Sequence, residues 1–158
     1  MTDRLLVRRA AVLGAGVMGA QIAAHLVNAG IPAVLFDLPA KEGDPRGIVR
    51  KGIDGLGRLE PAPLGTKDLA AQIAPAHYGD DLALLAGCDL VIEAIAERLD
   101  WKRDLYAKIA PHLAPHAILA SNTSGLSLAA LADAGPAGVR PRFCGIHFFN
   151  PPRYMHLC

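Results

Sequence analysis

Short continuous runs of apolar residues alternate along this chain with longer stretches in which apolar residues recur at helical spacing. The first run, residues 9–13 (RAAVL), stops at a glycine, and helical spacing then continues from Val17 to Gly30. A second apolar run, residues 32–36 (PAVLF), ends at Asp37. This order predicts a strand, a helix that Gly30 terminates, and a second strand, which together form a βαβ unit.

The same alternation continues to the end of the chain. Further strands are predicted at residues 88–94 (CDLVIEA), 117–121 (AILAS) and 142–148 (RFCGIHF), and helices at residues 45–59, 66–74, 100–109 and 127–133. Strands that helices cover on both faces are continuously apolar, as these runs are. We therefore expect an α/β fold, a Rossmann-type doubly wound, mainly parallel sheet with helices on both faces.

A glycine motif, GAGVMG, lies between the first predicted strand and the first predicted helix. Gly14, Gly16 and Gly19 follow the G-x-G-x-x-G pattern, which in this context binds a dinucleotide. The first glycine allows a tight turn, the second lets a pyrophosphate approach the backbone, and the third lets the helix pack closely on the strand. The amides of Val17 and Met18, at the helix start, complete the predicted phosphate site. An ordinary tight turn is the alternative.

Asp37, at the end of the second predicted strand, indicates which dinucleotide would bind. A carboxylate here can accept hydrogen bonds from both hydroxyls of the adenosine ribose and would repel a 2′-phosphate. The next residue is Leu38 and not an arginine. NAD is therefore favoured over NADP, with a solvated turn aspartate as the alternative.

Composition and charge narrow the possible partners. The 158-residue chain is 52% hydrophobic, has a net charge of +1 and contains no basic run, so nucleic acid is not expected as a partner. The three cysteines, Cys88, Cys144 and Cys158, are widely spaced, which predicts neither disulfides nor a metal site and favours a cytoplasmic location. The apolar stretch near the N-terminus is interrupted by Gln21 and His25, so no membrane association is expected.

Polar residues lie at or just beyond the ends of three further predicted strands. They are Glu93 and Glu97 in EAIAE, the SNTSG segment at residues 121–125, and His147. Each has a simpler explanation: acids at a helix start, a loop that ends in a cap at Ser127, or a histidine in the core. Ligands of open α/β sheets bind beyond the carboxyl ends of the strands, and this shared location favours one crevice lined by all three segments.

The motifs GAGVMG, VIEAIAE, SNTSGLS and GIHFFNPP, in this order and spacing, resemble the NAD-binding domain of L-3-hydroxyacyl-CoA dehydrogenase. The resemblance covers nearly the whole chain, and its last two motifs are the most specific because dinucleotide folds in general have no reason to carry them. It implies NAD-dependent oxidation of (S)-3-hydroxyacyl-CoA to 3-ketoacyl-CoA, as in fatty-acid β-oxidation. The implied substrate is an acyl-CoA.

The resemblance also implies roles for individual residues. His147 is implied to be the general base that takes the proton from the 3-hydroxyl, the role that histidine most often fills in enzymes. Ser124 and Asn150 are implied to hold the substrate oxygen and the nicotinamide side of the site. The residues implied to line the cofactor ribose and ring are Ala94, Glu97, Lys102 and Asn122, with Asp37 at the adenosine ribose.

Finally, the resemblance implies that the chain is a fragment. In the family a glutamate pairs with this histidine and falls here just past Cys158, and a helical domain follows that covers the acyl chain and forms a homodimer. We therefore expect residues 1–158 to be one NAD-binding domain, truncated at its C-terminal end, that binds NAD without turnover. The alternatives are a dehydrogenase of a free hydroxy acid or sugar acid, and a non-catalytic NAD-binding module.

Overall fold

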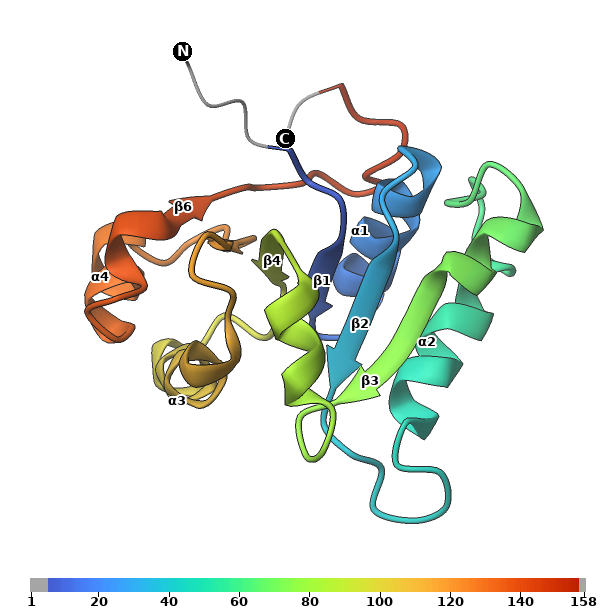
Figure 1. Cartoon of the computed structure of the whole chain (residues 1–158). Coiled ribbons are helices and arrows are strands. Elements are labelled where there is room, and N and C mark those ends of the chain that lie inside the picture. The colour runs from blue at the N-terminus through green and yellow to red at the C-terminus, as the bar shows by residue number, and fades with distance from the viewer. Residues whose placement is uncertain (1–5, 157–158) are drawn as a thin grey trace.

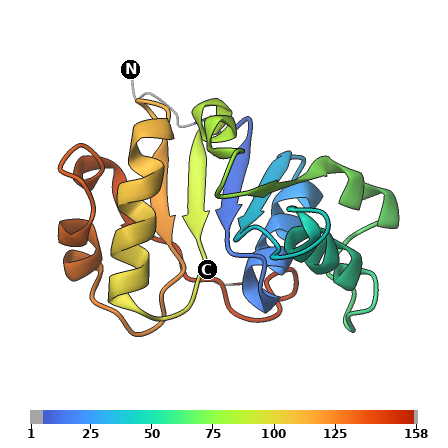
Figure 2. The ribbon, with the colours of Figure 1, turned by 90° about the horizontal axis from the view of Figure 1, so that it is seen from below.

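The computed structural model describes residues 6–156 of the chain, and its centre is a six-stranded sheet with the order β3-β2-β1-β4-β5-β6 (Figure 1). The strands are β1 (Ala10–Leu13), β2 (Ala33–Asp37), β3 (Ile73–His77), β4 (Leu90–Glu93), β5 (Ile118–Ser121) and β6 (Phe143–Gly145). Each runs parallel to its neighbours (Figure 2). In chain order, β2 and β3 lie on one side of β1, and β4, β5 and β6 lie on the other side. The predicted doubly wound parallel sheet is confirmed.

Helices cover both faces of this sheet. The α-helices are α1 (Val17–Asn28), α2 (Gly47–Leu56), α3 (Leu99–Ile109) and α4 (Leu128–Ala134), and the 3-10 helices are η1 (Lys67–Gln72), η2 (Leu82–Gly87), η3 (Ala110–His112) and η4 (Arg140–Arg142). In Figure 1, α1 and α2 lie to the right of the central strand β1, and α3 and α4 to its left. Within residues 6–156, no helix is long and apolar enough to cross a bilayer.

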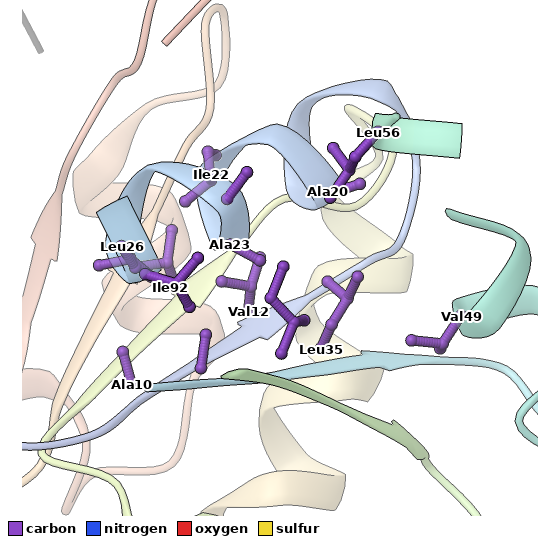
Figure 3. Close-up of a cluster of buried hydrophobic side chains, with 14 of the residues drawn as sticks. Ala10, Val12, Ala20, Ile22, Ala23, Leu26, Leu35, Val49, Leu56 and Ile92 are labelled. Atoms are coloured by element: carbon purple, nitrogen blue, oxygen red, sulfur yellow. The ribbon is translucent and has the colours of Figure 1, made fainter. Parts of the chain in front are cut away.

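The continuous apolar runs supply two cores, one on each face of the sheet. All four residues of β1 are buried, and successive side chains point to opposite faces. Val12 packs with Ile22 and Leu26 of α1 in one cluster (Figure 3), and Leu13 packs with Leu105 of α3 in the other. This double coverage explains why the strands do not alternate between apolar and polar residues.

The sequence pattern misses one strand. A helix is predicted over residues 66–74, but the structure has the short 3-10 helix η1 followed by β3. Pro75 lies within this strand and argues against a central position because it has no amide hydrogen to donate. The structure resolves the conflict by placing β3 at an edge of the sheet, where the strand has a neighbour on one side only.

The strand before His147 is shorter than predicted and lies at the opposite edge. A buried strand is predicted over residues 142–148, but β6 ends at Gly145, and Cys144 is exposed. The amide of Phe148 donates instead to the side chain of Asn122, at 2.8 Å. His147 therefore lies in the segment that follows the sheet, where it is available for other contacts.

Three α-helices begin at or within two residues of the positions predicted for them, 45, 100 and 127. The hydroxyl of Ser127 accepts a hydrogen bond from a backbone amide of α4, as predicted. Helix α2 begins at Gly47, because Asp44 forms a turn ahead of it in which its carbonyl accepts from the amide of Gly47. Helix α3 begins at Leu99, so Asp100 lies inside its first turn and does not cap it.

Candidate active site

The loop from β1 to α1 contains close contacts that only glycine permits. Gly14 has φ +105°, and a Cβ there would lie 2.8 Å from the carbonyl oxygen of Ala94. A Cβ on Gly19 would lie 1.7 Å from the carbonyl oxygen of Gly14, so this glycine sets the approach of α1 to the loop. A Cβ on Gly16, by contrast, would meet no atom within 4 Å. The space in front of Gly16 is therefore open to a ligand.

A pocket of about 540 Å³ lies beside this loop. Gly14, Gly16 and Asp37 line one side of it, and Trp101 of α3 lies on its wall. One carboxylate oxygen of Asp37 accepts a hydrogen bond from the amide of Ala15, at 2.6 Å, which ties the end of β2 to the glycine loop. The pocket thus combines largely apolar walls with the carboxylate of Asp37 at the position expected for an adenosine ribose.

These features fit a bound dinucleotide. Val17 and Met18 form the start of α1, and no acidic residue lies in the first turn, so the positive end of the helix dipole is not neutralised by its own side chains. The open space at Gly16 lies next to this helix end. Phosphates can therefore approach the backbone there while the adenosine enters the pocket beside Asp37.

A second part of the site joins the segments that follow β5 and β6. Ser124 Oγ and His147 Nε2 are 3.2 Å apart. The hydrogen bond from the amide of Phe148 to Asn122 holds these two segments together. The ring of His147 also packs against the ring of Phe149, with centroids 4.8 Å apart. A hydroxyl and an imidazole at this distance can exchange a hydrogen bond as the imidazole gains or loses a proton.

Glu97 holds the serine segment in place. Its carboxylate accepts hydrogen bonds from Thr123 Oγ1 at 2.7 Å and from the amide of Ser124 at 3.0 Å. Partial burial alone would raise the pKa of Glu97, but these hydrogen bonds and the nearby charge of Lys102 outweigh burial and lower the pKa. Glu97 therefore stays ionised at neutral pH and fixes the backbone beside His147.

Lys102, predicted to line the cofactor ribose, has its ammonium in the protein interior. The side chains of Lys102 and Glu93 are 1% and 0% exposed, and Lys102 Nζ lies 2.9 and 3.0 Å from the two Glu93 oxygens. Glu97 is 3.9 Å from the same ammonium. Glu93 also accepts hydrogen bonds from the hydroxyls of Tyr106 and Ser121. The Glu93 carboxylate therefore lies in the core, where Lys102, Tyr106 and Ser121 hold it.

From its position at a strand end, Glu93 is expected in the crevice, whereas it lies in this buried cluster. A signal for it is nevertheless present in the sequence. Lys102 and Tyr106 are four residues apart on a predicted helix, so they share the face that packs on the strand ending in Glu93. A cation and a hydroxyl on an inward helix face require a buried acceptor.

The structure gathers the predicted site residues at the carboxyl ends of the strands. Those around the pocket and the glycine loop are Gly14, Gly16, Val17, Met18, Gly19, Asp37 and Ala94, and those after β4, β5 and β6 are Glu97, Asn122, Ser124 and His147. Lys102 lies beneath the second group. Asn150 lies against α1, where its Oδ1 accepts a hydrogen bond from Gln21 Nε2 at 3.2 Å.

A comparison with protein families agrees with this geometry. The family described as "3-hydroxyacyl-CoA dehydrogenase, NAD binding domain" matches residues 9–158. The chain belongs to the 3-hydroxyacyl-CoA dehydrogenase family. The resemblance found in the motifs is thereby confirmed, and so is the cofactor, because NAD is the dinucleotide of this family.

Relatives of known name are longer than this chain. The putative fatty acid oxidation complex trifunctional enzyme of Rickettsia felis is 44% identical over 152 residues, covering 96% of the chain and 21% of that protein. The probable 3-hydroxyacyl-CoA dehydrogenase of Deinococcus radiodurans is 42% identical over 152 residues, covering 96% of the chain and 44% of that protein. The chain therefore spans less than half the length of either protein.

A solved structure supports the same family. The 3-hydroxybutyryl-CoA dehydrogenase of Escherichia coli K12 is 33% identical and superposes with a TM-score of 0.77, covering 96% of this chain and 31% of that chain. The two share the dehydrogenase fold over nearly all of the present sequence.

Proposed function

We propose that the full-length protein containing this domain oxidises (S)-3-hydroxyacyl-CoA to 3-ketoacyl-CoA with NAD⁺. The observation that carries the proposal is the contact of 3.2 Å between Ser124 Oγ and His147 Nε2, beyond the carboxyl ends of the strands, where the dinucleotide loop also lies. The names of the relatives, which include fatty acid oxidation enzymes, support an acyl-CoA as the substrate.

In the proposed mechanism, His147 is the general base. Without substrate, the hydroxyl of Ser124 can donate to the unprotonated Nε2 of His147. The substrate 3-hydroxyl takes this place as the donor to Nε2, and Ser124 then donates to the 3-oxygen. His147 Nε2 takes the hydroxyl proton as the C3–O bond becomes a carbonyl, and the new N–H then donates to Ser124 Oγ or to the product oxygen. When bound, NAD⁺ supplies the acceptor for the hydride that leaves C3. The side-chain amide of Asn150 holds the C3 oxygen of the substrate.

The other predicted residues are proposed to hold the cofactor. Asp37 accepts from the hydroxyls of the adenosine ribose, and the backbone from Gly14 to Gly19 holds the pyrophosphate. Ala94 and Asn122 line the ribose and ring on the nicotinamide side. Glu97 is proposed to contribute to the same surface, whereas Lys102 is buried and, contrary to expectation, does not line it.

We further propose that residues 1–158 form one NAD-binding domain that binds the cofactor without turnover. The lengths of the relatives support this division, because the dehydrogenase from D. radiodurans has more than twice the matched length. Measurable turnover by these 158 residues alone would contradict this part of the proposal.

The cofactor proposal predicts selective binding of NADH, which the chain's single tryptophan can report. Trp101 lies on the pocket wall and is 51% exposed, so excitation of its ring should give energy transfer to bound NADH. We expect saturable transfer with NADH and at least about tenfold weaker binding of NADPH, because Asp37 repels a 2′-phosphate. Asp37→Ser should narrow the gap between the two cofactors. Equal affinities of the unmodified chain for NADH and NADPH would contradict the role of Asp37.

The substrate proposal predicts oxidation of NADH that depends on acetoacetyl-CoA, measured with the full-length protein at 340 nm. A panel of free 3-hydroxy acids and sugar acids, assayed with NAD⁺, tests the alternative. We expect the CoA thioesters to have the higher kcat/KM, because remote parts of a substrate supply binding energy used at the reacting carbon. A preference for the free acids would favour the alternative dehydrogenase function.

A further inference from the structure

Helix α1 contacts the segment that follows β6, which crosses from the edge of the sheet to this helix (Figure 1). Gln21 lies on α1 and is only 5% exposed. Its Nε2 donates to the carbonyl oxygen of Val17 at 3.1 Å and to Oδ1 of Asn150 at 3.2 Å. One turn further along, the ring of His25 meets the ring of Phe148 edge to face, with centroids 5.9 Å apart.

The contact with Val17 fixes the orientation of both amides. A backbone carbonyl can only accept, so Gln21 must present its nitrogen to Val17. That nitrogen has two hydrogens, and the second one is donated to Asn150, which therefore accepts it with its side-chain oxygen. The Nδ2 group of Asn150 therefore points away from Gln21. Because Asn150 is exposed, this outward group is available as a hydrogen-bond donor.

We propose that Gln21 is a positioning residue that makes Asn150 a donor toward the C3 oxygen of the substrate. The inference rests on the proposed function, in which Asn150 holds that oxygen. In both directions of the reaction the C3 oxygen carries negative charge in the transition state, which a donor stabilises and an acceptor repels. The backbone of α1 thus determines, through two side-chain amides, the polarity that Asn150 presents to the substrate.

Two substitutions of similar length separate orientation from packing. In Gln21→Glu, an ionised carboxylate can only accept, and a protonated carboxyl uses its single hydrogen to donate to the Val17 carbonyl. In either state the carboxyl accepts from Asn150 Nδ2, so Asn150 turns its oxygen outward. We expect kcat of the full-length protein to fall about 100-fold, the effect of losing one transition-state donor. Gln21→Met leaves Asn150 free to rotate, and we expect a loss of about fivefold. Affinity for NADH and KM should change less than about twofold in both.

Nuclear magnetic resonance reads the orientation without any assay of activity. In the unmodified 158-residue chain, the Gln21 side-chain amide hydrogens should exchange slowly with water and those of Asn150 rapidly. In Gln21→Glu the Asn150 hydrogens should become protected. If the Asn150 hydrogens are already protected in the unmodified chain, or if Gln21→Glu keeps full kcat, the inference is wrong.

A double-mutant cycle tests the coupling between the two residues. Gln21→Met should lower kcat in the native background and have no further effect in Asn150→Ala. An equal loss in both backgrounds would show that Gln21 acts elsewhere and would overturn the inference. Full activity of Asn150→Ala would instead contradict the role of Asn150 in the proposed function, and the inference with it.

A matched control removes a different amide from the same helix. Asn28 donates to the carbonyl oxygen of Pro63 and accepts from the amide of Gly65, and neither bond includes Asn150. Asn28→Leu should lower the stability of the domain while leaving kcat unchanged at a temperature where the protein is folded. A fall in kcat equal to that of Gln21→Met would indicate a general effect of loosening α1 and would contradict the specific role of Gln21.

Discussion

Replacement of His147 by glutamine is expected to lower kcat of the full-length protein by about two to four orders of magnitude, the usual contribution of a general base. Glutamine retains hydrogen bonding to Ser124 but cannot take up the hydroxyl proton. Affinity for NADH should remain within about twofold, since His147 does not line the pocket beside Asp37. Steady-state kinetics and a tryptophan-based titration of NADH measure the two effects separately.

A surface histidine provides the control for this substitution. His116 has a 65% exposed side chain and pairs with Asp89, which follows η2 just before β4 begins, at the other end of the strands from the site. His116→Gln should leave both kcat and NADH affinity unchanged. If His147→Gln retained full turnover, His147 would have no part in proton transfer and the proposed mechanism would be wrong.

Replacement of Lys102 by methionine is expected to lower the free energy of unfolding by about 3–5 kcal/mol. The substitution keeps most of the side-chain volume but leaves the Glu93 carboxylate without its cation in a site that is 0% exposed. Urea unfolding, followed by circular dichroism, measures the loss. A variant as stable as the unmodified chain would show that this ion pair contributes nothing to the fold.

Two further variants show whether the loss comes from the unpaired charge. Glu93→Gln combined with Lys102→Met removes both charges, so this double variant should be more stable than Lys102→Met alone. Lys108→Met changes an exposed lysine on the same helix and should alter stability by no more than about 0.5 kcal/mol. Equal losses in the single and double variants would point to packing around Lys102 and not to charge.

The sequence predicts most of the sheet because strands that are buried on both faces consist of continuous runs of apolar residues. The runs that became β1, β2, β4 and β5 are continuously apolar, and few other structures require that pattern. The strands at the two edges of the sheet do not need to be continuously apolar. Pro75 is compatible with β3 only because the strand lies at an edge, and β6 is exposed and short, so its end could not be located from hydrophobicity.

Part of the candidate site could be predicted from the rule that ligands of open α/β sheets bind beyond the carboxyl ends of the strands. That rule brings together the segments that contain Ser124 and His147 before any contact between them is known. It does not tell whether a carboxylate at a strand end points outward or into the core, and so it does not separate Glu97 from the buried Glu93. It also cannot pair Gln21 with Asn150, which are 129 residues apart in the chain.

The strand order has a consequence for the chain as it is synthesised. β1 is made first, yet it lies in the middle of the sheet between β2 and β4. Once β1, β2 and β3 have emerged from the ribosome, the nascent chain can already form half of the sheet, with α1 and α2 on one face. Until residues 90–93 emerge, one edge of β1 then presents unpaired amides and carbonyls beside apolar side chains. Such an edge can pair with another chain. Synthesis of β4 ends this exposure, and it also brings Ala94, which completes the wall of the cofactor pocket.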